Sequence, residues 1–329
     1  MPAIAPERIL RDLAELWTSL AHPDQGEAST HGVLRACSMT LIVAARDASD
    51  AQNVSETLGA LMHEHPSRAI VLKPGPPGAE IEARVLAQCW MPFGSRQQIC
   101  CEQIEITAGL DRLNEIPPVM YGLLAPDLPS VLWSRGAAWW DAPAFRELVN
   151  MIGKLIIDSR RDDDRAQAFA RIRSLQEQGK RVADLAWGSV TAWRQLIAHA
   201  LELPANRTHL GAVRSIRVAG REGESVVPPL YVAAWLKHSL KNASVTLERD
   251  PPGPGEVSRV ILSGADWEIS FHRTESDAIE INAGAASRAV VLTPMDDCAV
   301  MREELSITGR DPVFDHVFPV ADQMAKESG

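Results

Sequence analysis

The pattern of short apolar segments changes about halfway along the chain, and this change limits the folds that fit. In the first half, segments such as ACSMTLIVAA (36–45) and AIVL (69–72) alternate with amphipathic stretches of helical period. This alternation is typical of an α/β layer. In the second half, strand-like segments recur about every ten residues, a spacing that predicts an antiparallel meander. We therefore expect an α/β (α+β) chain.

The expected meander consists of five segments and the turns between them. They are SVTLERD (244–250), VSRVILSG (257–264), WEISFHR (267–273), AIEINAG (278–284) and SRAVVLT (287–293). PPGPGE (251–256) is expected to be a turn or loop between the first two strands, because proline and glycine end regular structure.

A length of 329 residues favours two domains over one. The charged stretch SRRDDDRAQAFARIRSLQEQGKR predicts a helix between them. We expect an N-terminal α/β domain over residues 1–160, a helical connection over 161–181 and a C-terminal α+β domain over 182–329. The N-terminal sheet should be mixed, because segments 82–91 and 97–106 form a hairpin around MPFGSR.

Composition and charge narrow the classes of partner and compartment. A formal net charge of -10 argues against a nucleic-acid or anionic-membrane surface, because both need clustered Lys and Arg. The first residues carry no apolar signal-peptide core. Prolines and Asp127 interrupt the longest weakly charged stretch, so no membrane-spanning helix is expected there. We expect a cytoplasmic protein.

Five cysteines are scattered along the chain without a CxxC pair. Free, mostly buried thiols are the favoured interpretation. The hairpin keeps an alternative open, because a register centred on its turn places Cys89 opposite Cys100. These two residues are a candidate redox pair.

Motifs that carry chemistry are missing from the sequence. There is no GxGxxG after a strand, no GxxxxGK[ST] and no GxSxG, and the histidines and cysteines lack metal-ligand spacing. We expect no cofactor and no enzymatic activity of the chain's own.

Charged residues at the ends of apolar strands are the main candidates for a ligand site. Arg68 and Asp158 occupy such positions, where α/β folds place ligand groups. Interstrand or capping ion pairs are the favoured interpretation. The alternative is a sugar-phosphate or anion-binding enzyme or sensor that uses Arg68, Arg135 and Asp158.

The stretch DLAWGSVTAWRQLIAHAL (184–201) combines a helix pattern with two tryptophans. Thr191 is expected to be the N-cap, and Trp193 begins an apolar stripe that predicts a core-facing helix. Trp187 lies off that stripe. We expect a cation–π contact between Trp187 and Arg194, with Asp184 as a candidate ion partner of Arg194.

Trp139 and Trp140 stand side by side in a stretch expected to be a loop. Two adjacent indoles cannot both enter one core, so one of them is expected to contact a protein partner or a stacked ligand, or the loop folds back over its own domain. With Trp187 and Arg194 they make up the candidate partner-binding residues.

Five segments, taken in order, resemble the OpcA family of glucose-6-phosphate dehydrogenase assembly proteins. They are HPSRAIVL (65–72), CCEQIEI (100–106), DLPSVLWSRG (127–136), LIIDSR (155–160) and DLAWGSVTAWRQLIA (184–198). The chain departs from the family's usual residues at Cys101, Ser134, Arg135 and Ala192. Redox regulation in other members is therefore not assumed for these cysteines.

The resemblance implies a non-catalytic partner that binds glucose-6-phosphate dehydrogenase and promotes its active oligomer. The NADP would then belong to the partner enzyme, which agrees with the missing dinucleotide motif. A structural relative that no longer binds the dehydrogenase is a third interpretation, next to the anion-binding enzyme or sensor.

Overall fold

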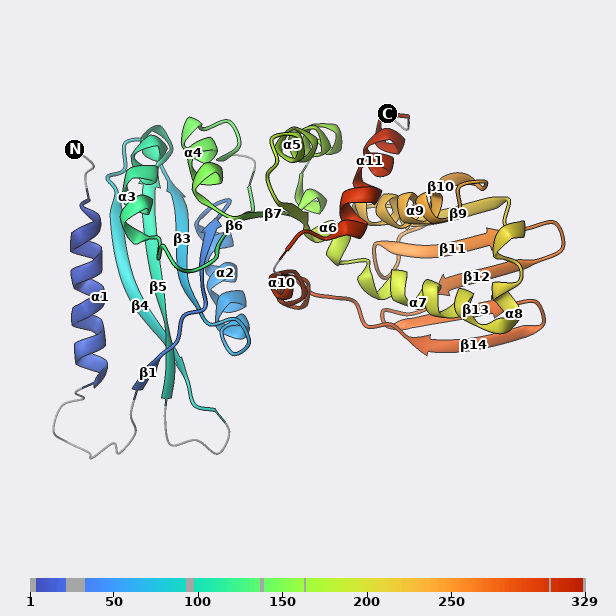
Figure 1. Ribbon diagram of the computed structural model, residues 1–329, viewed down its shortest axis with the longest axis horizontal. Helices are drawn as coiled ribbons and strands as arrows, with labels where there is room; N and C mark the ends of the chain where they lie inside the picture. The colour runs from blue at the N-terminus through green and yellow to red at the C-terminus, as the bar shows by residue number, and fades with distance from the viewer. Residues whose placement is uncertain are drawn as a thin grey trace. The chain divides into compact units, whose positions relative to one another are not determined.

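The chain folds into two compact units, which divide between Ile157 and Asp158. The structure is a computed structural model that describes residues 4–21, 33–92, 98–136, 139–162, 164–307 and 309–327. Within these residues, no helix is long and apolar enough to cross a membrane. Each unit has its own sheet, and both follow the expected α/β class with two domains (Figure 1).

The first unit contains seven strands and four α-helices among its described residues. The strands are β1 (Val33–Arg35), β2 (Met39–Ala44), β3 (Ser67–Gly75), β4 (Glu82–Trp90), β5 (Gln98–Gly109), β6 (Ser130–Ser134) and β7 (Lys154–Ile157). The helices are α1 (Pro6–Ala21), α2 (Ala48–Leu61), α3 (Ile116–Leu123) and α4 (Pro143–Met151), with a 3-10 helix, η1 (Leu110–Glu115), before α3.

The sheet of the first unit is mixed, as the sequence predicts. Its order is β1-β5-β3-β2-β6-β7, all parallel, and β4 pairs antiparallel with β5. The apolar stretch that becomes β2 lies inside the sheet, and the residues from Thr40 to Ala44 are all buried. Continuous burial of this kind is typical of a parallel strand covered on both faces.

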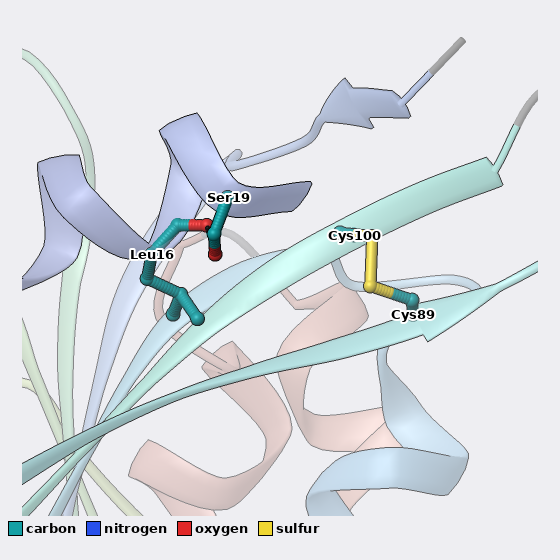
Figure 2. The surroundings of a disulfide bond; sticks show 4 residues. All are labelled: Leu16, Ser19, Cys89 and Cys100. Carbon is teal, nitrogen blue, oxygen red and sulfur yellow. Dashed lines mark hydrogen bonds between the residues drawn. A yellow bond between two sulfur atoms is a disulfide. The ribbon is translucent and has the colours of Figure 1, made fainter. Parts of the chain in front are cut away.

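Strands β4 and β5 pair in the register predicted from the sequence, while residues 93–97 of the expected turn MPFGSR lie outside the described residues. Cys89 is the direct partner of Cys100, and a disulfide joins the two sulfur atoms near Leu16 and Ser19 of α1 (Figure 2). Free thiols, the favoured interpretation from sequence, are therefore wrong for this pair. Burial raises the pKa of the neighbouring Cys101 thiol to about 11, which lowers its thiolate fraction at neutral pH and disfavours attack on the disulfide.

The second unit begins with short elements and then forms a sheet covered by helices. The strands are β8 (Val182–Asp184), β9 (Ser215–Arg221), β10 (Ser244–Asp250), β11 (Val257–Ser263), β12 (Glu268–Arg273), β13 (Ala278–Ala283) and β14 (Ala286–Val291). The helices are α5 (Arg165–Glu177), α6 (Leu185–Gly188), α7 (Thr191–Glu202), α8 (Pro204–Arg207), α9 (Val227–Ser239), α10 (Asp297–Ser306) and α11 (Pro312–Glu327), with 3-10 helices η3 (Ser159–Arg161) and η4 (Leu210–Ala212).

The sheet of the second unit has the order β10-β9-β11-β12-β13-β14. Strands β11 to β14 form the expected antiparallel meander. The prediction was wrong for 244–250, because β10 pairs in parallel with β9, and α9 connects the two. Parallel neighbours need such a crossover, so the loop over 251–256 leads past β9 to β11 and is not a hairpin turn.

Helices α9 and α11 form the apolar core of the second unit together with the sheet. α9 packs on β9, β10 and α11, and nearly all of it from Val227 to Leu236 is buried (Figure 1). A helix that is apolar around its whole circumference belongs in an interior. The stretch 161–181, expected as a helical connection, contains α5. This helix belongs to the second unit and packs on α11.

Reduction of the Cys89–Cys100 bond should lower the free energy of unfolding by about 3 kcal/mol, because it opens a short covalent loop. Urea unfolding with and without dithiothreitol measures this change. A Cys89→Ser/Cys100→Ser variant is the control, and reductant should leave its stability unchanged. Equal sensitivity of both proteins, or free-thiol labelling at Cys89 without reductant, contradicts the expectation.

Candidate functional site

The two adjacent tryptophans belong to a loop that folds back on its own unit. Trp139 is 1% exposed, and its Nε1 donates a hydrogen bond to the Ala45 carbonyl at 2.8 Å. Trp140 is half-buried, with its ring 4.6 Å from that of Phe145. The prediction that Trp139 contacts a protein partner is therefore wrong, because its indole is buried and its N–H is hydrogen-bonded inside the unit.

Trp187 is also buried, at 3% exposure, and its Nε1 donates to Asp311 at 2.8 Å. The expected cation–π contact is confirmed, because the Arg194 guanidinium lies 3.4 Å from the Trp187 ring centroid. Burial lowers the pKa of Arg194 to about 10. This stacked pair holds α6 to α7 and leaves the indole inaccessible to a partner.

Two details of this segment differ from the prediction. The N-cap of α7 is Val190, and Thr191 is its first residue, whose hydroxyl accepts a hydrogen bond from Arg194 at 2.7 Å. Asp184 does not pair with Arg194. Its carboxylate is fully buried elsewhere and caps α6 by accepting from the Ala186 N–H.

The strand-end arginines of the first unit are paired with carboxylates. Arg68 donates to Glu102 at 3.1 Å, and its register partner Thr40 is near the start of β2. Arg135 donates to Asp50 at 2.7 Å and follows the opposite end of the sheet, since Ser134 pairs with Ala44. The two arginines therefore do not form a common anion site.

Asp158 is likewise held by its neighbours. Its side chain accepts hydrogen bonds from Arg160 at 2.7 and 2.8 Å and from Arg161 at 2.9 Å. Burial raises the pKa of Asp158, but the hydrogen bonds and charges of the two arginines outweigh it and leave the pKa lowered. This is the ion pair that the sequence favoured.

A cavity of about 270 Å³ lies at one end of the sheet in the second unit. We call it the Trp193 pocket. It is lined by Arg160, Ser189, Val190, Ala192, Trp193, Glu224, Gly255, Glu256, Val257, Arg273, Leu292, Thr293, Pro294 and Met295. These residues come from η3, the start of α7, the loops before β11 and after β9 and β14, and the end of β12.

Asp184 fixes two of the walls of this pocket. Its carboxylate accepts hydrogen bonds from the Ser159 N–H at 3.0 Å and hydroxyl at 2.5 Å, and from the Tyr231 hydroxyl at 2.7 Å. Burial raises the pKa of Asp184, and these hydrogen bonds act against the shift. Ser159 precedes Arg160, and Asp184 precedes the α6–α7 segment, so one carboxylate positions both.

The positive charge of Arg160, on one wall of the pocket, is neutralised by neighbouring carboxylates. Besides Asp158, its Nη2 donates to Asp297 at 3.1 Å, and Arg161 donates to the same Asp297 carboxylate at 2.5 Å. Two arginines and two carboxylates thus form a balanced group on one wall.

Arg273 lies on another wall and has no carboxylate partner among the described residues. Its guanidinium donates to the Ser276 carbonyl at 2.5 Å and lies 5.4 Å from the Trp193 ring centroid. Burial and the nearby charge of Arg221 lower the pKa of Arg273. Gly255 makes this packing feasible, because a Cβ there would lie 2.8 Å from the Arg273 Nε and its φ is +74°.

Glu256 follows Gly255, and no described residue hydrogen-bonds or ion-pairs with its carboxylate. Burial raises the pKa of Glu256 to about 7, against the lowering effect of Arg160. A titratable group of this kind in a cleft marks a candidate functional site.

Sequence reasoning missed Glu256 and Arg273. The pattern PPGPGE indicates a turn or loop and assigns no role to Glu256, its single charged residue. Arg273 is a charged residue at the end of an apolar strand. The same pattern makes Arg68 and Asp158 candidates for a ligand site in the first half of the chain. Among the described residues, no group of three His, Cys, Asp or Glu side chains is placed to hold a metal ion.

The chain is thus a two-unit α/β protein with a charged pocket in its second unit, and comparisons with known proteins place it in a family. A family model described as the glucose-6-phosphate dehydrogenase subunit N-terminal domain matches residues 59–174, and the corresponding C-terminal domain model matches 180–318. The chain belongs to the OpcA family.

Curated relatives agree with this assignment. A protein of Synechocystis sp. named OxPP cycle protein OpcA is 25% identical over 64% of this chain and 44% of its own length. One of the same name from Synechococcus elongatus is 29% identical over 54% of this chain and 40% of its own length. The chain therefore matches less than half of each relative.

Among solved structures, the 3-ketoreductase KijD10 of Actinomadura kijaniata, with NADP and TDP-benzene, aligns with a TM-score of 0.49. Its identity is 10%, over 86% of this chain and 94% of that one. Nothing about function follows at this level of similarity.

Replacing Asp184 should destabilise the second unit. Asp184→Ala leaves the buried Ser159 and Tyr231 donors unsatisfied and should lower the free energy of unfolding by about 3–5 kcal/mol, whereas Tyr231→Phe should cost about 1–2 kcal/mol. Tyr121→Phe is the control, since Tyr121 is 65% exposed. A cost for Asp184→Ala no larger than that control, measured by urea unfolding, would contradict this role.

The raised pKa of Glu256 predicts a pH dependence of stability. The native state holds a proton that the unfolded state releases between about pH 4.5 and 7, so stability should fall as pH rises through this window. Glu256→Gln should remove that part of the decline, and Glu275→Gln, which removes an exposed carboxylate of the same unit outside the pocket, should not. Identical profiles of thermal unfolding against pH for all three proteins would show that Glu256 titrates normally.

Proposed function

We propose that this chain is a non-catalytic assembly factor and allosteric activator of glucose-6-phosphate dehydrogenase in the cytoplasm. It would bind the dehydrogenase and favour its active oligomer in the oxidative pentose phosphate pathway. The observation that carries the proposal is the pair of OpcA domain models, which match residues 59–174 and 180–318. The relatives' name, OxPP cycle protein, supports the same pathway.

The mechanism proposed is differential binding. A partner shifts an oligomer equilibrium only by the difference between its affinities for the two states. The chain would therefore bind the active oligomer of the dehydrogenase more tightly than its other forms. No step of the reaction is assigned to this chain, and NADP would bind the dehydrogenase.

The contact surface is proposed to include the two predicted residues that keep partly accessible side chains. These are Trp140 in the first unit and Arg194 in the second. Trp139 and Trp187 would act indirectly, by holding Trp140 and Arg194 in place. Aromatic residues and arginines with partial burial are typical anchors of protein interfaces.

Co-purification tests the proposal. The full-length chain, mixed with the cognate dehydrogenase, should co-elute with it in size-exclusion chromatography, raise its specific activity and shift its oligomer distribution in analytical ultracentrifugation. Absence of a complex, together with unchanged activity and oligomer distribution, would refute the assembly role and favour a relative that no longer binds the enzyme.

Trp140→Ser tests the contact surface separately. Loss of an aromatic anchor typically costs 2 kcal/mol or more, so the dissociation constant should rise by about thirtyfold. Leu110→Ser is the matched control, because Leu110 is 47% exposed in the same unit and is not a proposed contact. Unchanged binding by Trp140→Ser would remove Trp140 from the interface without affecting the proposed role.

A further inference from the structure

The Trp193 pocket has the features of a ligand site, and the proposed function assigns it no role. Polar side chains reach it from separate segments of the second unit, and its walls also contain Val190, Leu292 and Pro294. A concave, partly apolar site with a few convergent polar groups is the usual form of a small-molecule site. Its volume of about 270 Å³ suits a ligand of modest size.

The charge balance of the walls indicates where an anion would bind. Arg160 and Arg161 are neutralised by Asp158 and Asp297. The Arg273 guanidinium donates hydrogen bonds only to backbone carbonyls. The neighbouring Arg221 also donates only to backbone carbonyls, those of Pro251 and Arg273. Among the described residues, Arg273 is therefore the arginine of the pocket without a hydrogen-bonded carboxylate, although the charge of Asp277 acts on it. Its guanidinium geometry suits phosphate oxygens.

Glu256 and Glu224 are acceptors in the same pocket, so the ligand also needs hydrogen-bond donors. Neither carboxylate accepts a hydrogen bond from a described side chain, so both have free acceptor oxygens. Glu256 is half-buried and Glu224 is exposed, so a ligand in the pocket can reach their oxygens. Because Glu256 carries only part of its charge at neutral pH, it suits a neutral hydroxyl donor better than an ammonium group. Ser189 and Thr293 add hydroxyl groups to the same walls.

We propose that the Trp193 pocket binds a small phosphorylated polyol, with its phosphate at Arg273 and its hydroxyl groups at Glu256 and Glu224. The apolar wall around Trp193 would cover the carbon skeleton of the ligand. This site belongs to the second unit alone and does not rest on the proposed partner.

The pocket is organised before any ligand arrives. Gly255 lets the loop over 251–256 pack directly on the Arg273 side chain, and Gly253 does so on Arg221, where a Cβ would lie 3.1 Å from the guanidinium carbon. Asp184 fixes the walls that contain Arg160 and Ser189. A ligand therefore meets side chains that need little ordering, which favours measurable affinity for a small molecule.

Isothermal titration calorimetry of the full-length chain, without dehydrogenase, tests the proposal with hexose 6-phosphate, free hexose and inorganic phosphate. Hexose 6-phosphate should bind at least about tenfold more tightly than either fragment, since only it engages Arg273 and Glu256 together. Equal affinity for inorganic phosphate would identify an anion site and overturn the polyol assignment. Absence of hexose 6-phosphate binding would overturn the proposal altogether.

Two variants locate the binding site. Arg273→Lys loses the bidentate geometry and Glu256→Gln loses a carboxylate acceptor, and each should weaken hexose 6-phosphate binding about tenfold. Arg217→Lys is the matched control, because Arg217 is an exposed arginine of β9 that pairs with Glu268 outside the pocket. If Arg273→Lys fails to fold, the near-isosteric Glu256→Gln decides. Undiminished binding by a folded pocket variant would place the ligand elsewhere and refute the assignment.

Because the titration uses the chain alone, its failure is distinguishable from failure of the assembly role. A chain that co-elutes with the dehydrogenase but binds no hexose 6-phosphate would refute only the pocket proposal. A chain that binds the ligand but no dehydrogenase would refute only the assembly role.

Discussion

The buried carboxylate of Asp184 is the interaction on which the second unit depends. A charge without solvent is costly unless hydrogen bonds surround it, and Asp184 receives them from Ser159, Ala186 and Tyr231. These donors come from η3, α6 and α9, which are distant in sequence. A single group thereby selects one arrangement of three segments, which is the structural value that a fully satisfied buried polar network can have.

The charged side chains of the chain fall into two kinds. Arg135 with Asp50, and Arg160 with Asp158, are buried pairs whose hydrogen bonds compensate the loss of hydration. Arg273 and Glu256 lie in a cavity without such partners. Strand-end charges are therefore poor indicators of function by themselves, because a neighbouring carboxylate or guanidinium decides whether any binding capacity remains.

Local patterns in the sequence predicted much of the fold. A register centred on MPFGSR predicted the pairing of Cys89 with Cys100, and continuous apolarity identified β2 as an internal strand. Long-range contacts were not predictable. Nothing near β10 in the sequence shows that it pairs with β9, and the acceptor that buries Trp139 is Ala45, far away along the chain. The pocket was missed for the same reason, since Glu256 and Arg273 meet only in the folded sheet.

An accessory protein with its own ligand pocket is subject to a thermodynamic constraint. If a phosphorylated polyol in the Trp193 pocket changes the affinity of this chain for the dehydrogenase, the dehydrogenase must change the affinity for that ligand by the same factor. Gly255 packs on Arg273, and Asp184 hydrogen-bonds the segments that carry Arg160 and Ser189. Coupling would therefore require the dehydrogenase to contact those walls or to displace an element that carries them, such as the loop over 251–256. A ligand bound equally well in the free and complexed chain would leave the assembly equilibrium unchanged, however tightly it bound.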